Sequence, residues 1–143
     1  NTEISICGSN EELQKMREYY WIYVRWMRLN QRGKRISHLL KDRGINSVIV
    51  YGYKELGECL VNELSCDGIE IRFIIDKIKE GEVGDIIIKK PENANDYNTC
   101  IIVTPTFYFD EIRAYLSELG FLKVVSLKHI IEEWGRYDDT GSI

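Results

Sequence analysis

Three features are missing from this sequence of 143 residues, and each absence argues against a class of protein. No apolar stretch approaches the ~20 residues that span a bilayer, and no basic segment followed by an apolar one opens the chain, so we expect neither a membrane span nor a leader. Basic residues are not in excess, and the net charge of -4 argues against nucleic acid as a partner. The four cysteines never approach Cys-x-x-Cys spacing, which favours a cytoplasmic protein without a metal site.

The common catalytic motifs are absent as well. None of the nine tyrosines has a lysine four residues on, as the Tyr-x-x-x-Lys pair of a sugar epimerase or dehydratase requires. Neither His-Glu-x-x-His nor Gly-x-Ser-x-Gly occurs. We therefore assign no catalytic residue and expect that these residues alone are not a complete enzyme. Whether these residues form part of a larger enzyme stays open.

The composition is that of an ordinary globular domain. Hydrophobic residues make up 44% of the chain and charged residues 29%, and the length suits one domain with a real core. The sequence begins at Asn1 rather than at a methionine, which suggests a piece of something longer.

Residues 1–44 are expected to form an N-terminal helical segment. We expect residues 1–8 to be irregular and Ser9–Glu12 to form a capping box for a long helix that Gly33 ends. A shorter helix follows over 34–43. The long helix, over about 12–30, carries an unusually aromatic face, made by Tyr19, Tyr20, Trp21, Tyr23 and Trp26. That face either packs on the domain behind it or forms an interface, with a second subunit as a homodimer or with a fused glycosyltransferase domain.

Short apolar strands alternate with helical patterns over 45–134. Strands are predicted at 47–51, 69–75, 85–89, 99–103 and 122–126, and helices at 56–64, 110–119 and 128–134. The direction of the strand at 85–89 is open, because a parallel partner usually needs a longer connection than the chain offers there. The pattern predicts an α/β protein with a Rossmann-like open, mostly parallel sheet of about five strands and flanking helices. Residues 135–143 are expected to be a polar tail.

A glycine turn follows the first predicted strand. Gly52 and Gly57 occupy the outer positions of the Gly-x-Gly-x-x-Gly pattern that directs a helix N-terminus at a phosphate, but Lys54 stands at the middle one. Either the Lys54 ammonium binds a phosphate, or the site has lost its nucleotide. A P-loop is excluded, because Glu58 and Cys59 occupy the places of its lysine and hydroxyl residue.

Two further segments are expected at the same edge of the sheet. Asp76 ends the second strand. It follows Gly52 by about the number of residues at which an acidic residue of this pattern binds the ribose hydroxyls. An acidic residue there also commonly forms a turn, and both interpretations stay open. Thr104 and Pro105 end the strand at 99–103. Ligands of open α/β sheets bind beyond these carboxyl ends, so the three segments predict one binding crevice.

The chain also resembles a known group of domains, over roughly residues 20–132. The similarity lies in the segments 48–64, 69–77, 89–93 and 100–121. These resemble the small Rossmann-like domains of bacterial polysaccharide and capsule biosynthesis proteins, which look like the nucleotide-binding halves of sugar-nucleotide epimerases and dehydratases and occur alone or fused to glycosyltransferases. Tyr53 and Lys54 replace the alanine and glycine usual there.

The resemblance implies roles for particular residues. Gly52, Tyr53, Leu56 and Gly57 match the phosphate turn, Asp76 the ribose-binding acid, and Thr104 with Pro105 the loop after the fourth strand. The expected ligand is NAD or a nucleotide-sugar.

Together these observations predict an accessory domain of a cell-surface polysaccharide or glycosyltransferase protein, which binds a nucleotide or nucleotide-sugar without catalysis of its own. Two alternatives stay open. One is a protein-protein interaction module with a vestigial nucleotide site. The other is the cofactor half of an NAD-dependent sugar-nucleotide epimerase or dehydratase, with the chemistry supplied by a second domain.

Overall fold

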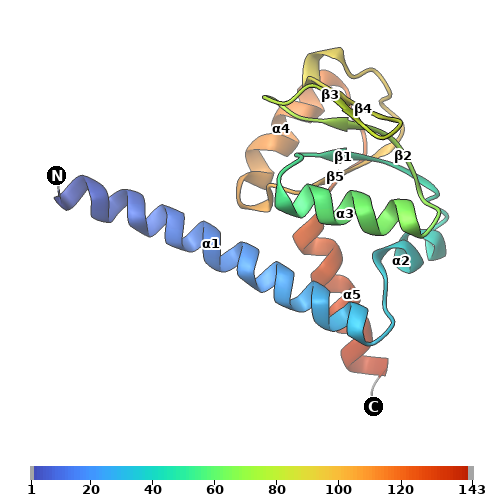
Figure 1. Cartoon of the computed structure of the whole chain (residues 1–143), viewed down its shortest axis with the longest axis horizontal. Coiled ribbons are helices and arrows are strands. Elements are labelled where there is room, and N and C mark those ends of the chain that lie inside the picture. The colour runs from blue at the N-terminus through green and yellow to red at the C-terminus, as the bar shows by residue number, and fades with distance from the viewer. Residues whose placement is uncertain (1, 142–143) are drawn as a thin grey trace.

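The computed structural model describes the backbone of residues 2–141 and the side chains of residues 10–136. Within this part of the chain, six strands form one open sheet in the order β3-β4-β2-β1-β5-β6 (Figure 1). The strands are β1 (Ser47–Tyr51), β2 (Glu70–Ile75), β3 (Gly81–Val83), β4 (Ile86–Lys89), β5 (Cys100–Val103) and β6 (Val124–Ser126). All neighbouring strands run parallel except β3 and β4.

Helices cover both faces of the sheet. Those described are α1 (Thr2–Gln31), α2 (Ile36–Asp42), α3 (Glu55–Cys66), α4 (Phe109–Leu119) and α5 (Leu127–Gly141). Figure 1 shows α4 on one side of the sheet and α1, α2, α3 and α5 on the other. Two buried hydrophobic clusters match this division, one between the sheet and α4 and one beneath the remaining helices. The predicted Rossmann-like α/β fold is therefore confirmed.

The central strand β1 illustrates why the sequence folds this way. Val48, Ile49 and Val50 are completely buried, and successive side chains of a strand point to opposite faces. Val48 and Val50 belong to the cluster under α3, and Ile49 belongs to the cluster under α4. A continuous β-branched run is thus the pattern that a strand covered on both faces requires.

The sheet has one strand that the sequence pattern did not predict. Strand β3 pairs antiparallel with β4, and β4 in turn runs parallel to β2. After β2 the chain returns along the sheet edge as β3, turns at Gly84, whose φ is +60°, and re-enters as β4. This short return strand takes the place of a crossover helix, so the direction left open for residues 85–89 is parallel. Strand β3 was not predicted because its sequence is polar and contains a glycine.

Two expectations at the ends of the chain were wrong. Helix α1 begins at Thr2, so residues 2–8 are helical and Ser9–Glu12 lie inside the helix rather than capping it. No proline interrupts this stretch, and one glycine costs a helix only about 1 kcal/mol. Helix α5 likewise continues past Trp134 to Gly141, where a polar tail was expected. Residues 1, 142 and 143 lie outside the described part.

The carboxylate of Glu63 fixes α1 to the rest of the domain. Its Oε1 accepts hydrogen bonds from Trp26 Nε1 and Asn30 Nδ2, each at 2.9 Å, and its Oε2 accepts one at 2.8 Å from the backbone N–H of Ile36. Glu63 is only 7% exposed, and it joins α3 to α1 and to the start of α2. Much of the aromatic face of α1, including the buried Trp26, therefore packs inside the chain.

Replacing this carboxylate is expected to loosen α1. In Glu63→Gln an amide NH₂ faces one of the three donors, and the unpaired buried group should lower the free energy of unfolding by about 2 kcal/mol. Urea denaturation measures the change. The matched control is Glu58→Gln, an exposed position of the same helix, expected to stay within about 0.5 kcal/mol of wild type. Equal losses in the two variants would contradict the role of Glu63.

Candidate functional site

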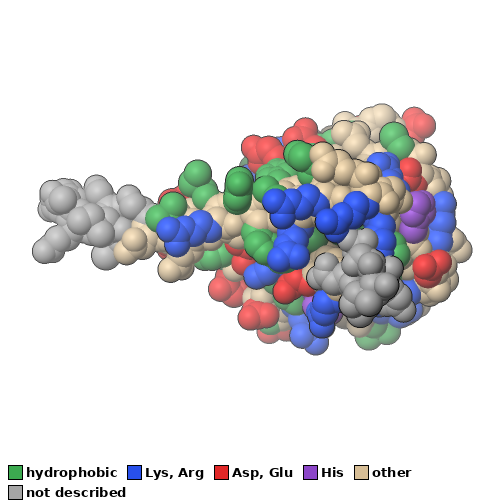
Figure 2. All heavy atoms as spheres, turned by 90° about the horizontal axis from the view of Figure 1, so that it is seen from below, with side chains coloured by type: hydrophobic (Ala, Val, Ile, Leu, Met, Phe, Trp, Pro, Cys, Tyr) green, Lys and Arg blue, Asp and Glu red, His purple; other side chains and the backbone are tan. Residues whose placement is uncertain are grey.

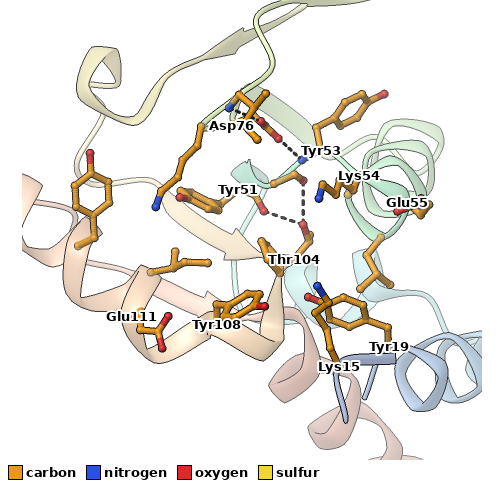
Figure 3. Close-up of a pocket in the computed structure, with 18 of the residues that line it drawn as sticks. Lys15, Tyr19, Tyr51, Tyr53, Lys54, Glu55, Asp76, Thr104, Tyr108 and Glu111 are labelled. Carbon is orange, nitrogen blue, oxygen red and sulfur yellow. Dashed lines mark hydrogen bonds between the residues drawn. The ribbon is translucent and has the colours of Figure 1, made fainter. Parts of the chain in front are cut away.

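A cavity of about 370 Å³ opens at the carboxyl ends of β1, β2 and β5. The three loops that leave these strands form its floor and one wall, while α1 and α4 form the opposite walls (Figure 3). All eight residues predicted from the sequence line it: Gly52, Tyr53, Lys54, Leu56, Gly57, Asp76, Thr104 and Pro105. The structure thus brings together three segments that lie far apart in the sequence.

The two glycines of the turn are required by close packing. Gly52 has φ of +91°, and a Cβ there would lie 2.7 Å from both Pro105 Cδ and Thr104 Oγ1. A Cβ at Gly57 would lie 2.0 Å from the carbonyl oxygen of Gly52. Helix α3 therefore starts in direct contact with the end of β1. These are the roles that the first and third glycines play in a dinucleotide-binding turn.

Thr104 connects the β5 loop to this turn. Its Oγ1 lies 2.8 Å from the carbonyl oxygen of Tyr51 and 2.9 Å from that of Gly52, so the hydroxyl donates to this pair of carbonyls. The hydroxyl is buried, and Pro105 follows it against Gly52. The β1 and β5 loops are consequently held in one arrangement without a ligand.

Lys54 occupies the N-cap of α3 with extended backbone, φ -102° and ψ -156°. This conformation is open to any residue, so the middle position of the turn does not need glycine for its backbone. The side chain is exposed and lines the cavity, as Figure 3 shows. Its ammonium can reach an anion in the cavity, whereas bare backbone at this position could approach a phosphate more closely.

Asp76 organises the crevice by accepting three backbone hydrogen bonds. Its Oδ2 accepts from the N–H of Tyr53 at 2.9 Å, and its Oδ1 accepts from Ile78 and Lys79 at 2.9 and 2.8 Å. Burial alone would raise the pKa of this carboxyl, but the bonds from Lys79, Ile78 and Tyr53 outweigh it and hold the pKa below its usual value. These three contacts are those expected of an acidic residue that forms a turn. A carboxylate has about four lone-pair sites, so Asp76 can also accept a hydrogen bond from a ribose hydroxyl.

Several residues of the cavity carry no sequence motif. Lys15, Tyr19 and Tyr23 come from α1, and Tyr108, Glu111 and Tyr115 come from α4 and the turn before it. Figure 3 shows Lys15 and Tyr19 reaching toward the cavity from α1. Burial raises the pKa of Tyr19 and Tyr23 to about 12, so their hydroxyls stay protonated. The aromatic spacing of α1 was the only available signal for this wall.

Tyr51 is the most informative of the unpredicted residues. It is 3% exposed, it lines the cavity, and its hydroxyl oxygen is buried with no hydrogen-bond partner among the described residues. Burial raises its pKa to about 12, so the group remains a neutral donor. A buried polar group without a partner costs free energy. A ligand atom in the cavity could supply that partner.

Charged side chains of both signs line the cavity. Lys15, Lys54 and Lys77 line it from three separate elements, and the first N–H groups of α3 have no partner within the helix. Three carboxylates, of Glu55, Asp76 and Glu111, line the cavity as well. The lysines and the start of α3 can bind a phosphate beside the aromatic side chains of the cavity.

Among the described residues no cluster of three or more histidine, cysteine, aspartate or glutamate side chains could hold a metal ion. Within residues 2–141 no helix combines the length and the apolar character that crossing a membrane would need. The chain matches no family model, no curated protein and no solved structure.

The bonds to Asp76 predict a pH-dependent contribution to stability. Because its pKa in the folded state lies below the usual 3.8, the ionised carboxylate stabilises the fold above that pH and loses its effect as the pH falls through the lowered value. Asp76→Asn is expected to cost about 1 to 2 kcal/mol of unfolding free energy at pH 7, with the difference from wild type shrinking below pH ~4.

Urea denaturation at several pH values measures this difference. Asp85→Asn, in the exposed turn between β3 and β4, is the matched control and is expected to stay near wild type throughout. A deficit in Asp76→Asn that is the same at pH 7 and at pH 3 would contradict the assignment.

Proposed function

We propose that this chain is an accessory Rossmann-like domain that binds a nucleotide or nucleotide-sugar in the crevice between Gly52 and Asp76, without catalysis of its own. The observation that carries the proposal is the convergence of all eight sequence-assigned residues on one cavity. In open α/β sheets this position, beyond the carboxyl ends of the central strands, is where ligands bind. The setting in cell-surface polysaccharide biosynthesis, or alongside a glycosyltransferase, rests on the sequence resemblance described above.

The contacts around the cavity favour a particular orientation of the ligand. The phosphates lie at the start of α3, where Lys54 replaces the close backbone approach of a glycine. The ribose lies at Asp76, whose Oδ2 accepts only the N–H of Tyr53 and has capacity left. The base lies on the α4 side of the cavity, where the Tyr51 hydroxyl supplies a hydrogen bond.

Isothermal titration calorimetry against NAD, NADP, UDP-sugars and GDP-sugars tests the proposal. At least one of these ligands is expected to bind, and NAD is expected to bind more tightly than NADP, because the ionised Asp76 repels a 2′-phosphate. Absence of binding heat and of any thermal shift with all four would overturn the binding proposal. Tighter binding of NADP would overturn the role of Asp76 alone.

Removing the Tyr51 hydroxyl is expected to change ligand affinity without lowering the stability of the fold. Tyr51→Phe is expected to weaken the bound nucleotide roughly five- to tenfold, since a hydrogen bond contributes about 1 kcal/mol, while the stability of the free protein stays equal or rises. Calorimetry and thermal unfolding of the same samples measure both. The matched control is Tyr97→Phe, whose ring packs against Phe121 outside the cavity. Unchanged affinity in Tyr51→Phe would show that this hydroxyl does not contact the ligand.

A further inference from the structure

One face of α1 is apolar, exposed and turned away from the body of the protein. Its members, with exposed fractions between 47% and 71%, are Leu13, Met16, Tyr20 and Met27, called here the α1 stripe. Ile22, Trp26 and Leu29 on the same helix are buried in the core. At ~100° per residue the stripe lies roughly 140° around the helix axis from that buried face.

The surroundings leave this face open along its length. The N-terminal half of α1 projects beyond the sheet and the other helices (Figure 1). Figure 2 shows hydrophobic side chains between lysine and arginine side chains along this projecting helix. The stripe begins on this projecting half with Leu13 and Met16 and continues along the rest of the helix with Tyr20 and Met27. Four exposed large apolar side chains on one helix face are unusual for a surface that stays in water.

The spacing of the stripe is that of a coiled-coil seam. Met16 follows Leu13 by three residues and Tyr20 follows Met16 by four, while Met27 lies seven residues after Tyr20. The half-buried Tyr23 falls at the intermediate position but lines the cavity, so the exposed stripe itself has the spacings of three, four and seven residues. Positions a and d of a heptad repeat follow this rule, and they pack against the same positions of a second helix.

The charges beside the stripe are complementary between two copies of the chain. With Leu13 at position a, Glu12 falls at g and Arg17 at the following e, and both are exposed. In a parallel pair, a g side chain faces the next e side chain of the other helix, so Glu12 of each copy meets Arg17 of the second copy. The Oε1 of Glu12 also lies 3.6 Å from the Nζ of the half-buried Lys15 in its own chain, and such an ion pair near the surface contributes little to stability.

The geometry points to a homodimer in which the α1 stripes of two copies pair as a parallel coiled coil, with the two α/β bodies on the outer sides. Helix α1 already spans 30 residues, so pairing needs no helix nucleation. The interface is narrower than the whole aromatic face of 12–30, because Trp26 belongs to the core. The inference is independent of any ligand in the cavity.

Light scattering coupled to size-exclusion chromatography, over a range of concentrations, tests the dimer. The wild-type chain is expected to form a dimer that dissociates on dilution, and Tyr20→Glu is expected to raise the dissociation constant by roughly 30-fold or more, because two carboxylates enter the apolar seam. Gln14→Glu adds the same charge at an exposed position off the stripe and is expected to leave the dimer intact. A monomeric wild type, or equal loss in both variants, would overturn the proposal.

A charge exchange tests the parallel register. Glu12→Arg and Arg17→Glu each place like charges opposite one another and are expected to weaken the dimer, while the double variant restores the attraction and recovers it. Circular dichroism confirms that each variant is folded. If the double variant dimerises no more tightly than the single variant with the higher dissociation constant, the parallel arrangement is overturned.

Discussion

The contact between the start of α3 and the end of β1 is the constraint on which the site depends. Gly57 lies so close to Gly52 that any side chain at position 57 would overlap the Gly52 carbonyl group. This approach directs the first turn of α3 at the crevice. The neighbouring loops are then fixed to the same turn, that of β5 through Thr104 and that of β2 through Asp76. The cavity is therefore preformed, and a ligand would not have to order its loops.

The cavity differs from a glycine-rich phosphate site in the groups that face an anion. The N–H of Tyr53 is already bound to Asp76, and the next residue is Lys54 instead of glycine. Phosphate binding would thus depend more on the ammonium groups of the exposed Lys54 and Lys77 and of the half-buried Lys15 than on bare backbone. Exposed charges are screened by salt, so the affinity should fall as ionic strength rises. The buried aromatic compartment around Tyr51 is less sensitive to salt.

Most of the fold and part of the lining of the cavity could be predicted from the sequence. Continuous β-branched runs such as Val48–Val50 predict the buried strands. Gly52 and Gly57 predict the turn, because close packing there leaves no room for a side chain. Strand β3 was missed because an exposed edge strand of three residues needs no apolar pattern. The walls from α1 and α4 were missed because tertiary packing alone brings Tyr19 and Tyr115 to the same cavity, and the spacing of residues along the chain does not show this. The ends of α1 and α5 were also predicted wrongly, because both helices run further than the sequence pattern indicated, α1 from Thr2 and α5 to Gly141.

Both edges of the sheet are short, and this limits how the protein can associate. Strands β3 and β6 have three residues each, and β3 carries the exposed Glu82. An edge offers its unpaired backbone groups to any extended chain, and short, charged edges blunt that tendency. Little backbone is thus available for sheet extension or for the fibrous stacking that flat, apolar edges permit. Any contact between copies would then fall to side chains, where geometry and charge can select the partner.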